Sequence, residues 1–197
     1  RGAGEIGLDP GLCPRATVVI MAKPLHPSPP VLSRDGVSLT VANTRRNLPE
    51  ALSPQIKSTN FLNNILAKRE SIAAGTFDSL FLNWKDELTE CTVSNLFFIS
   101  GKTLHTPALD CGILDGITRT IVMTLAQEEG VPVREGHYHL ADLQQAEECF
   151  LTNTSMEIMP VNRVDSFTIG DGRPGSLTRR LQTRFADSRT RFLEPPS

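Results

Sequence analysis

The spacing of apolar residues predicts one long helix that follows a single lysine. Apolar side chains fall at positions 61, 62, 65 and 66, a spacing that places them on one face of a helix. We predict a helix over residues 60–74, capped by Thr59 or Asn60 and ended by Gly75. We expect its apolar face to be buried, so that the helix holds Lys57, just before its start, in a fixed place.

The remaining apolar runs are short and predict more strands than helices. Clean alternation over residues 37–41 indicates a strand with one solvent-exposed face. The predicted strands span residues 16–21, 37–41, 77–83, a short segment around Leu88, 95–100, 131–138, 149–152 and 158–164. The other predicted helices span residues 117–129, 141–146 and 177–185, and residues 106–116 are predicted to form a loop. Because some strands follow one another directly, the pattern favours a mixed α/β or α+β domain over a regular βαβ series.

Composition divides the chain into a short first part and a main domain. Residues 1–36 are rich in glycine and proline, and we interpret them as an irregular opening segment with the first strand. Residues 37–197 are interpreted as the main domain. The chain begins with Arg1 rather than methionine, which is typical of a processed or excised piece of a longer polypeptide.

Charge and cysteine content disfavour several classes of function. The formal net charge of −2 disfavours nucleic acid as the main ligand. We expect no membrane partner, since no apolar run reaches the length of a membrane-spanning helix and no secretory leader is visible. Cys13, Cys91, Cys111 and Cys149 are scattered without a CxxC pair, so we expect reduced thiols in a cytoplasmic protein rather than disulfides or a zinc site.

Two further patterns are weak candidates for a ligand site. His137 and His139 would share one face of a strand, but without an apparent third ligand we interpret them as surface histidines and expect no bound metal. Residues 170–175 match GxGxxG literally. Pro174 removes a backbone amide there and no βαβ unit surrounds the motif, so we predict a loop before the last helix instead of a dinucleotide site.

Lys57 and Glu90 are the candidates for nucleophilic and acid–base chemistry. A lysine held in a desolvated site has a lowered pKa and becomes an amine nucleophile. On its own stretch alone, a solvated surface lysine is the better interpretation of Lys57. Apolar flanks indicate that Glu90 is partly buried and needs a cationic partner, and the alternative is a turn glutamate in water.

Two polar stretches are candidates for binding an anion. Residues 112–119 run from a glycine loop into a predicted helix start, where free amides, the helix dipole and the Thr118 hydroxyl suit a phosphate. An ordinary helix start is an equally good interpretation. Residues 152–155 end a predicted strand with four small polar side chains, which could donate to a second side of a phosphate. A polar turn is the better interpretation of that stretch alone.

Together these stretches occur in an order that resembles a known family. The matching segments are Ile56-Lys57-Ser58-x-Asn60, Thr89-Glu90-x-x-x-Ser94-Asn95, Thr106-Pro107, Gly112-Ile113-Leu114-x-Gly116-Ile117-Thr118-Arg119, Ala146-Glu147-Glu148-Cys149-Phe150-Leu151-Thr152-Asn153-Thr154 and Pro160-Val161. Over roughly residues 37–185 the order resembles the class IV, or fold type IV, pyridoxal-phosphate enzymes. That family includes branched-chain and D-amino-acid aminotransferases and aminodeoxychorismate lyase.

The resemblance implies a fold, a cofactor and two catalytic residues. The expected fold is an α/β large domain with a mixed-sheet pseudo-barrel, in which residues 37–197 bind pyridoxal 5'-phosphate. Lys57 would form the Schiff base and shuttle protons, and Glu90 would keep the pyridine nitrogen protonated. The resemblance also implies an N-terminal small domain that this chain lacks, and assembly as a homodimer.

For the cofactor phosphate, the resemblance implies four residues from two segments. Ile117 and Thr118 would hold the phosphate through amides and a hydroxyl at the helix start. Thr154 would hold it from the other side, and Ser155 would lie nearby, facing phosphate or substrate.

The function implied is amino-group transfer between an amino acid and a 2-oxo acid. A lyase that cleaves aminodeoxychorismate to 4-aminobenzoate and pyruvate is an alternative, and a non-catalytic binding protein that retains the fold is a further one. Asn60 and Phe61 lie three and four residues after Lys57. That spacing is similar to the D-amino-acid transaminase and lyase branch and argues against a branched-chain substrate.

Overall fold

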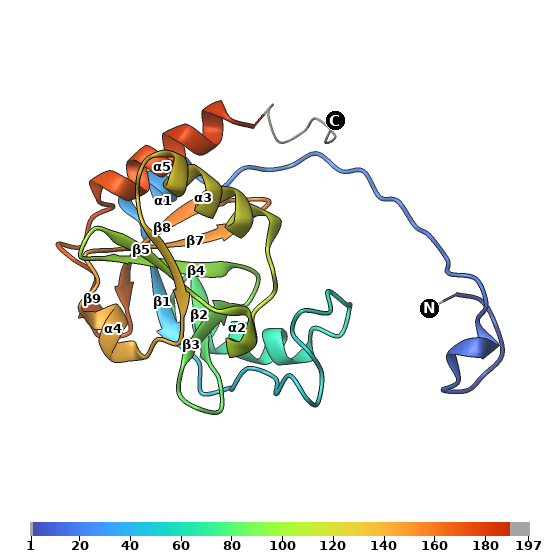
Figure 1. Ribbon diagram of the computed structural model, residues 1–197. Coiled ribbons are helices and arrows are strands. Elements are labelled where there is room, and N and C mark those ends of the chain that lie inside the picture. The colour runs from blue at the N-terminus through green and yellow to red at the C-terminus, as the bar shows by residue number, and fades with distance from the viewer. Residues whose placement is uncertain (1, 190–197) are drawn as a thin grey trace.

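The computed structural model describes residues 2–189, which form one mixed sheet with helices on its outer faces (Figure 1). The strands are β1 (Val37–Val41), β2 (Asp78–Leu82), β3 (Leu88–Cys91), β4 (Asn95–Ser100), β5 (Thr103–Pro107), β6 (Val133–Gly136), β7 (Glu148–Asn153), β8 (Glu157–Val164) and β9 (Phe167–Thr168). The helices are α1 (Pro30–Asp35), α2 (Leu62–Ala74), α3 (Ile117–Glu128), α4 (Leu140–Gln144) and α5 (Ser176–Asp187), with 3-10 turns η1 (Pro10–Leu12) and η2 (Leu109–Cys111).

Six of these strands close into a barrel. Their order is β3-β2-β1-β8-β7-β4, and β3 pairs back with β4 to complete the ring. β1 is parallel to both β2 and β8, whereas the other pairs of the ring are antiparallel. β5 extends the sheet from β4, and β6 follows it in parallel. The expectation of a mixed-sheet pseudo-barrel of the α/β class is confirmed.

Alternation along the strands divides the apolar residues between two cores. In β4, Leu96 and Phe98 point into the barrel and pack in the same cluster as Leu151 of β7. Phe97 points the other way and stacks on Phe150, with ring centroids 5.1 Å apart, in a second cluster that α3 and α5 cover. The barrel interior is therefore filled by side chains, and any ligand must bind outside it, at the strand ends.

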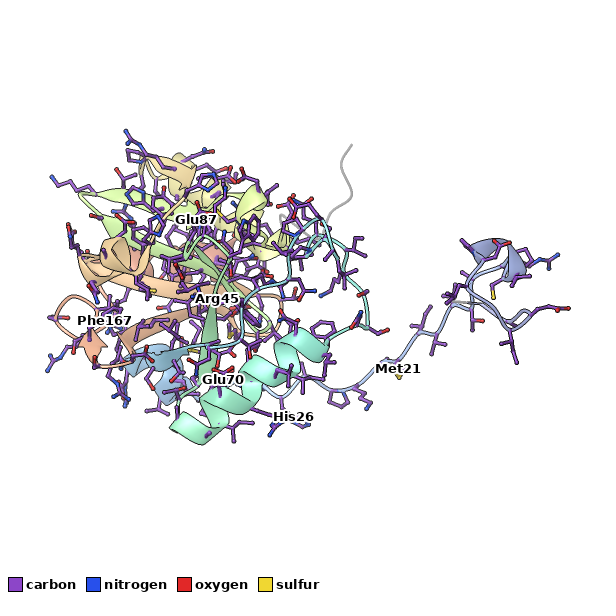
Figure 2. The ribbon with its side chains drawn as sticks, turned by 90° about the horizontal axis from the view of Figure 1, so that it is seen from below. Met21, His26, Arg45, Glu70, Glu87 and Phe167 are labelled. Atoms are coloured by element: carbon purple, nitrogen blue, oxygen red, sulfur yellow. The ribbon has the colours of Figure 1, made fainter. Side chains whose placement is uncertain are left out.

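The predicted strand over residues 16–21 is wrong. These residues have no regular secondary structure, and the side chains of Val18, Val19 and Ile20 are exposed. Figure 2 shows Met21 on a segment that extends away from the barrel. The β-branched sequence is suited to a strand, but a strand forms only where a neighbouring strand satisfies its backbone groups.

The long helix forms, but its predicted buried face is wrong. α2 begins at Leu62 without a side-chain cap, two residues later than predicted, and ends at Gly75 in the left-handed conformation, as predicted. Leu62 and Ile65 are more than half exposed. The helix instead packs on β1 and β2 through the small residue Ala67, whose carbonyl accepts a hydrogen bond from the Ser79 hydroxyl. Close approach of helix and sheet has selected the face with small side chains.

Two elements escaped the sequence pattern. α1 lies in the proline-rich part of residues 1–36 and packs on β8, so that this segment is not wholly irregular. β5 precedes and overlaps the predicted loop at 106–116, and a tight turn with positive φ at Gly101 and Lys102 connects it to β4. Arg1 and residues 190–197 of the predicted domains lie outside the described residues, and the division at residue 37 stays a prediction. Within the described chain, each helix is too short or too polar to span a bilayer.

Candidate functional site

A cavity of about 350 Å³ lies where the strand ends, the start of α3 and the segment before α2 meet. Five of the six residues expected to bind a cofactor line it: Lys57, Glu90, Ile117, Thr118 and Thr154. Ser155 is not among the lining residues, and its amide donates to Asn153 Oδ1 in the turn after β7. The volume is in the range of ligand pockets, roughly 300–1,000 Å³. Segments far apart in sequence are thus brought to one cavity, while the role of each residue stays a prediction.

Strand register places Glu90 in a row of polar side chains. Glu90 of β3 pairs with Asn95 of β4, and Asn95 pairs with Thr152 of β7. Residues opposite one another in antiparallel strands point to the same face. The three polar groups therefore face the start of α3 together, on the side of the sheet opposite the barrel interior.

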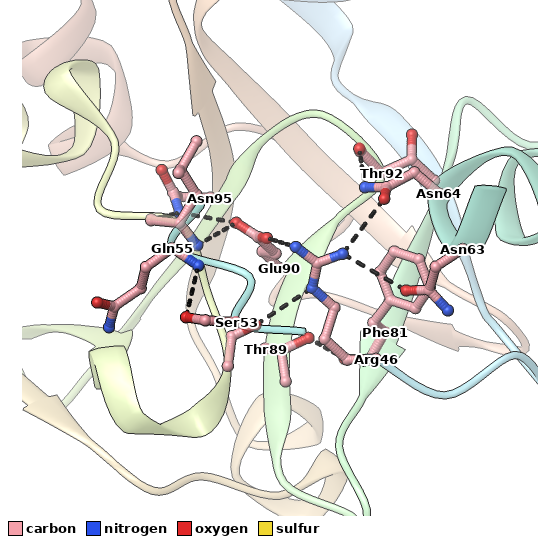
Figure 3. A network of polar contacts seen from close by, with 12 residues as sticks. Arg46, Ser53, Gln55, Asn63, Asn64, Phe81, Thr89, Glu90, Thr92 and Asn95 are labelled. Atoms are coloured by element: carbon pink, nitrogen blue, oxygen red, sulfur yellow. Dashed lines mark hydrogen bonds and ion pairs between the residues drawn. The ribbon is translucent and has the colours of Figure 1, made fainter. Parts of the chain in front are cut away.

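The Glu90 carboxylate is buried and has three hydrogen-bond donors. Arg46 Nη2 lies 2.5 Å from Oε1, and Asn95 Nδ2 and the Leu114 amide each donate to Oε2 at 3.1 Å. Figure 3 shows the Arg46 guanidinium directed at this carboxylate. The expectation of a buried acid with a cationic partner is met in the structure, because Glu90 is 5% exposed and Arg46 8%.

Burial and charge act in opposite directions on Glu90. Burial raises the pKa of Glu90 to about 7, while the charge of Arg46, the amide of Leu114 and the charge of Lys57 lower it. The carboxyl group therefore changes charge near neutral pH, and an additional cation beside it would favour the ionised form.

Arg46 was not singled out from the sequence. Its Nε donates to the Gly112 carbonyl at 3.2 Å, its Nη1 donates to Asn64 Oδ1 at 3.3 Å, and the guanidinium lies 5.3 Å from the centre of the Phe81 ring. The sequence signal was the need of Glu90 for a cation, but nothing local indicates which of the 20 basic residues supplies it. Arg46 connects the cavity wall to the loop before α3.

The start of α3 leaves backbone donors free at the cavity. Gly116 is the N-cap, with no side-chain cap, and Ile117 and Thr118 are the first two helical residues. A Cβ atom on Gly116 would overlap Asn95 Oδ1, so only glycine allows the helix to approach the sheet this closely. First-turn amides have no partner within a helix, and the helix dipole favours an anion beside them.

Two hydroxyl groups on the cavity wall are buried without a partner. Ser94 Oγ and Thr152 Oγ1 make no hydrogen bond in the described structure, although both residues line the cavity. Burying a polar group without a partner costs about 1–3 kcal/mol, so a ligand that bonds to these hydroxyls would recover that free energy. Both residues stand in the matched motifs, but the sequence did not distinguish them from spacers.

Lys57 lies on a different kind of wall. It is exposed, so the expectation of a lysine held in place by a buried helix is wrong. The hydrogen bonds within its segment are short-range, including Ile56 N to the Ser53 carbonyl and Asn60 N to Ser58 Oγ. The reason is that α2 packs through its small residues, and the apolar face next to this segment stays open to solvent.

The GxGxxG match forms a loop before α5, as predicted. At the end of this loop the Glu148 carboxylate accepts hydrogen bonds from the amides of Leu177 and Thr178. A Cβ on Gly175 would overlap Glu148, which explains the last glycine of the motif. A carboxylate already occupies the helix start that a dinucleotide phosphate would need.

Comparison with known proteins agrees with this geometry. The family "Amino-transferase class IV" matches residues 1–164, and the chain belongs to this family. Over 192 residues the chain is 38% identical to a Methanocaldococcus jannaschii protein whose name places it with the branched-chain-amino-acid aminotransferases, covering 98% of this chain and 66% of that protein. It is 38% identical over 136 residues to D-alanine aminotransferase of Listeria monocytogenes, covering 69% of this chain and 47% of the relative.

Solved structures of the same class share the fold. Escherichia coli branched-chain amino acid aminotransferase superposes with a TM-score of 0.78 at 31% identity, covering 80% of this chain and 52% of that structure. A branched-chain amino acid aminotransferase of T.th. solved with pyridoxamine 5'-phosphate has a TM-score of 0.76 at 29% identity, covering 79% and 51%. The chain thus spans about half the length of most of these relatives, and about two thirds of the archaeal one.

Proposed function

We propose that this chain is the cofactor-binding part of a pyridoxal-phosphate-dependent aminotransferase, which moves an amino group between an amino acid and a 2-oxo acid. One observation carries the proposal: an amine, a buried carboxylate and the start of a helix line a single cavity. Membership of the class IV family supports it, as does the relative solved with pyridoxamine 5'-phosphate. The activity of the whole protein is part of the proposal, because the chain covers only part of its relatives.

The donors and acceptors of the cavity fit the proposed cofactor. Its aldehyde requires an amine, its ring nitrogen an acid, and its phosphate several hydrogen-bond donors. The cavity offers Lys57, Glu90, the first amides of α3, and the unpartnered hydroxyls of Ser94 and Thr152. When bound, the cofactor acts as an electron sink for the carbon that carries the amino group.

Lys57 and Glu90 have separate roles in this proposal. Lys57 provides the amine for the covalent link, the Schiff base, and as a free amine it carries the proton at the substrate α-carbon. Glu90 holds a proton on the ring nitrogen, and Arg46 and Asn95 hold the Glu90 carboxylate in place. A protonated ring beside Glu90 also keeps that carboxylate ionised near pH 7.

The phosphate is proposed to bind at the start of α3. The amides of Ile117 and Thr118 and the Thr118 hydroxyl face the cavity from one side, and Thr154 lines it at the end of β7. Ser155 follows Thr154 in the same turn, and we propose a contact with phosphate or substrate only if that turn closes over the ligand.

The substrate is proposed at the level of an amino acid and a 2-oxo acid. The chain is 38% identical both to a relative named for branched-chain amino acids and to a D-alanine aminotransferase, so the spacing of Asn60 and Phe61 does not select between them. Aminodeoxychorismate lyase activity is the second candidate. It is favoured by 34% identity over 168 residues, 85% of this chain, to the Bacillus subtilis enzyme of that name.

We also propose that the whole protein is a cytoplasmic homodimer. The cysteines are free thiols, as expected in a reducing compartment. The exposed side chains of Leu62, Ile65 and Ile72 on α2 form an apolar surface that assembly could cover. Sedimentation of the whole protein would give a monomer mass if the dimer proposal is wrong.

Covalent trapping tests the cofactor site on the chain itself. Incubation with pyridoxal 5'-phosphate followed by borohydride should add one cofactor mass, and peptide mapping should place it on Lys57. Lys57→Ala should lose the label, whereas Lys85→Ala, at a lysine outside the cavity, should retain it. Labelling spread over many lysines, with no loss in Lys57→Ala, would contradict the proposal.

A second assay on the whole protein separates the two candidate reactions. Turnover that requires a 2-oxo acid supports the aminotransferase, and release of 4-aminobenzoate without an oxo acid supports the lyase. Specific cofactor binding without either activity would favour a binding protein that retains the fold.

A further inference from the structure

Glu87, Cys111 and His137 form a cluster outside the cavity. Their ligand atoms all lie within 4.8 Å of one another, and among the described residues this is the group of three with metal-ligand geometry. Glu87 is in the turn that leads into β3, Cys111 ends η2, and His137 follows β6. None of the three lines the candidate active site.

The distances inside the cluster match a tetrahedral ion. His137 Nδ1 lies 3.1 Å from Glu87 Oε1 and 3.5 Å from Cys111 Sγ. Zinc bonds of about 2.0–2.3 Å at tetrahedral angles separate neighbouring ligands by roughly 3.3–3.6 Å. Small side-chain movements would therefore place one cation at bonding distance from all three atoms.

A fourth side chain fixes the orientation of the histidine. Asp110 Oδ2 lies 3.3 Å from His137 Nε2, on the side of the ring away from Glu87 and Cys111. A carboxylate in this position accepts the Nε2 proton and leaves the Nδ1 lone pair free to bind a metal, an arrangement common around metal-bound histidines. Glu87 is oriented in turn by Asn83 Nδ2 at 2.7 Å.

Backbone contacts hold the three segments together independently of the cluster. The Leu88 amide donates to the Tyr138 carbonyl at 2.6 Å, and Asn83 Nδ2 also donates to the Cys111 carbonyl at 3.2 Å. Cys111 and Glu87 are buried, whereas the His137 side chain is 44% exposed. An ion can therefore approach past His137 and bind to a preformed set of ligands.

We infer that Glu87, Cys111 and His137 bind a thiophilic divalent cation of the Zn²⁺ type, with Asp110 orienting the histidine. A thiol, an imidazole and a carboxylate select zinc over magnesium or calcium, and three protein ligands leave one position for water. The ion would brace the loop of residues 109–114, whose Leu114 amide donates to Glu90. The sequence expectation of no metal rested on His139, whereas the partners of His137 come from distant turns.

Metal titration of the intact chain tests this inference. Zn²⁺ is titrated alone against a chromogenic chelator, and Co²⁺ is used to detect thiolate coordination by its charge-transfer absorption. We expect one saturable zinc site, a cobalt–thiolate band, and a raised midpoint of thermal unfolding with Zn²⁺ but not with Mg²⁺.

The variants separate the cluster from other zinc-binding groups. His137→Ala and Cys111→Ser should weaken zinc binding by at least about tenfold, and Asp110→Asn by about tenfold. The matched controls His26→Ala and Cys13→Ser should bind zinc as the parent does. Because Cys111 is buried, a poorly folded Cys111→Ser leaves the half-exposed His137 as the deciding position. No saturable zinc binding by the parent, or equal binding by His137→Ala, would overturn the inference.

Discussion

The cavity has one wall of packed strands and another made of a surface segment, and the two hold their functional groups in different ways. On the strand wall, Glu90 is fixed by Arg46, Asn95 and the Leu114 amide, which come from three other parts of the chain. On the other wall, Lys57 is exposed and its segment is held by hydrogen bonds between near neighbours. The strand wall is preorganised, whereas the lysine wall depends on a ligand or on further polypeptide for its final position.

The largest expected effect is the loss of the Arg46 charge. Under alkaline conditions, where Glu90 is ionised, Arg46→Met should destabilise the chain by about 3–5 kcal/mol because it leaves a buried charge unpaired. Lys57→Met, on the exposed wall, should change the free energy of unfolding by less than about 0.5 kcal/mol. Denaturant unfolding measures both. Equal losses in the two variants would remove the distinction between the walls.

The pH dependence of stability isolates Glu90. Its pKa in the folded chain is about 7, above the ordinary value of 4.5, so between these values the folded state binds more protons than the unfolded state. Stability therefore falls as pH rises through this window, by at most about 3 kcal/mol. Burial lowers the pKa of His105, which acts in the opposite direction. The difference between parent and Glu90→Gln cancels this histidine, and a difference that does not change with pH would contradict the assignment.

Gly116 tests how closely α3 must approach the strand wall. Gly116→Ala should cost about 1–3 kcal/mol, because the new methyl group displaces the Asn95 side chain from Glu90 and from the Leu114 carbonyl. Asp115→Ala, at the exposed neighbouring position, is the control and should be nearly neutral. Thermal unfolding that is unchanged in Gly116→Ala would show that the helix start can move.

The smallest effect is expected on binding alone. Thr118→Val keeps the shape of a buried side chain but removes one hydroxyl, and it should weaken pyridoxal 5'-phosphate binding by about 1–3 kcal/mol. Equilibrium titration of parent and variant measures the dissociation constants. An unchanged constant would exclude the Thr118 hydroxyl from the phosphate site.

Local patterns predicted much of the fold but not every buried face. Alternation identified β1 and β4, and Gly75 and Gly130 marked the ends of helices correctly. The face of α2 was predicted wrongly because hydrophobicity alone does not tell that a helix packs through Ala67 and Ser71. The segment 16–21 was predicted wrongly because a strand depends on a partner that its own sequence does not specify.

The site shows the same limit. Motif order located Lys57, Glu90 and the start of α3, since these stand in recognisable local sequences. Arg46 was missed because its role arises from a contact across 44 residues. Ser94 and Thr152 were missed because only three-dimensional burial shows that their hydroxyls lack partners.

A crystal structure of the whole protein with pyridoxal 5'-phosphate would test the central claim most directly. The account predicts a covalent bond from Lys57 Nζ to the cofactor, the Glu90 carboxylate at the ring nitrogen, and the phosphate at the first amides of α3. A cofactor bound elsewhere, or a Lys57 amine directed into solvent while the cofactor occupies the cavity, would contradict it.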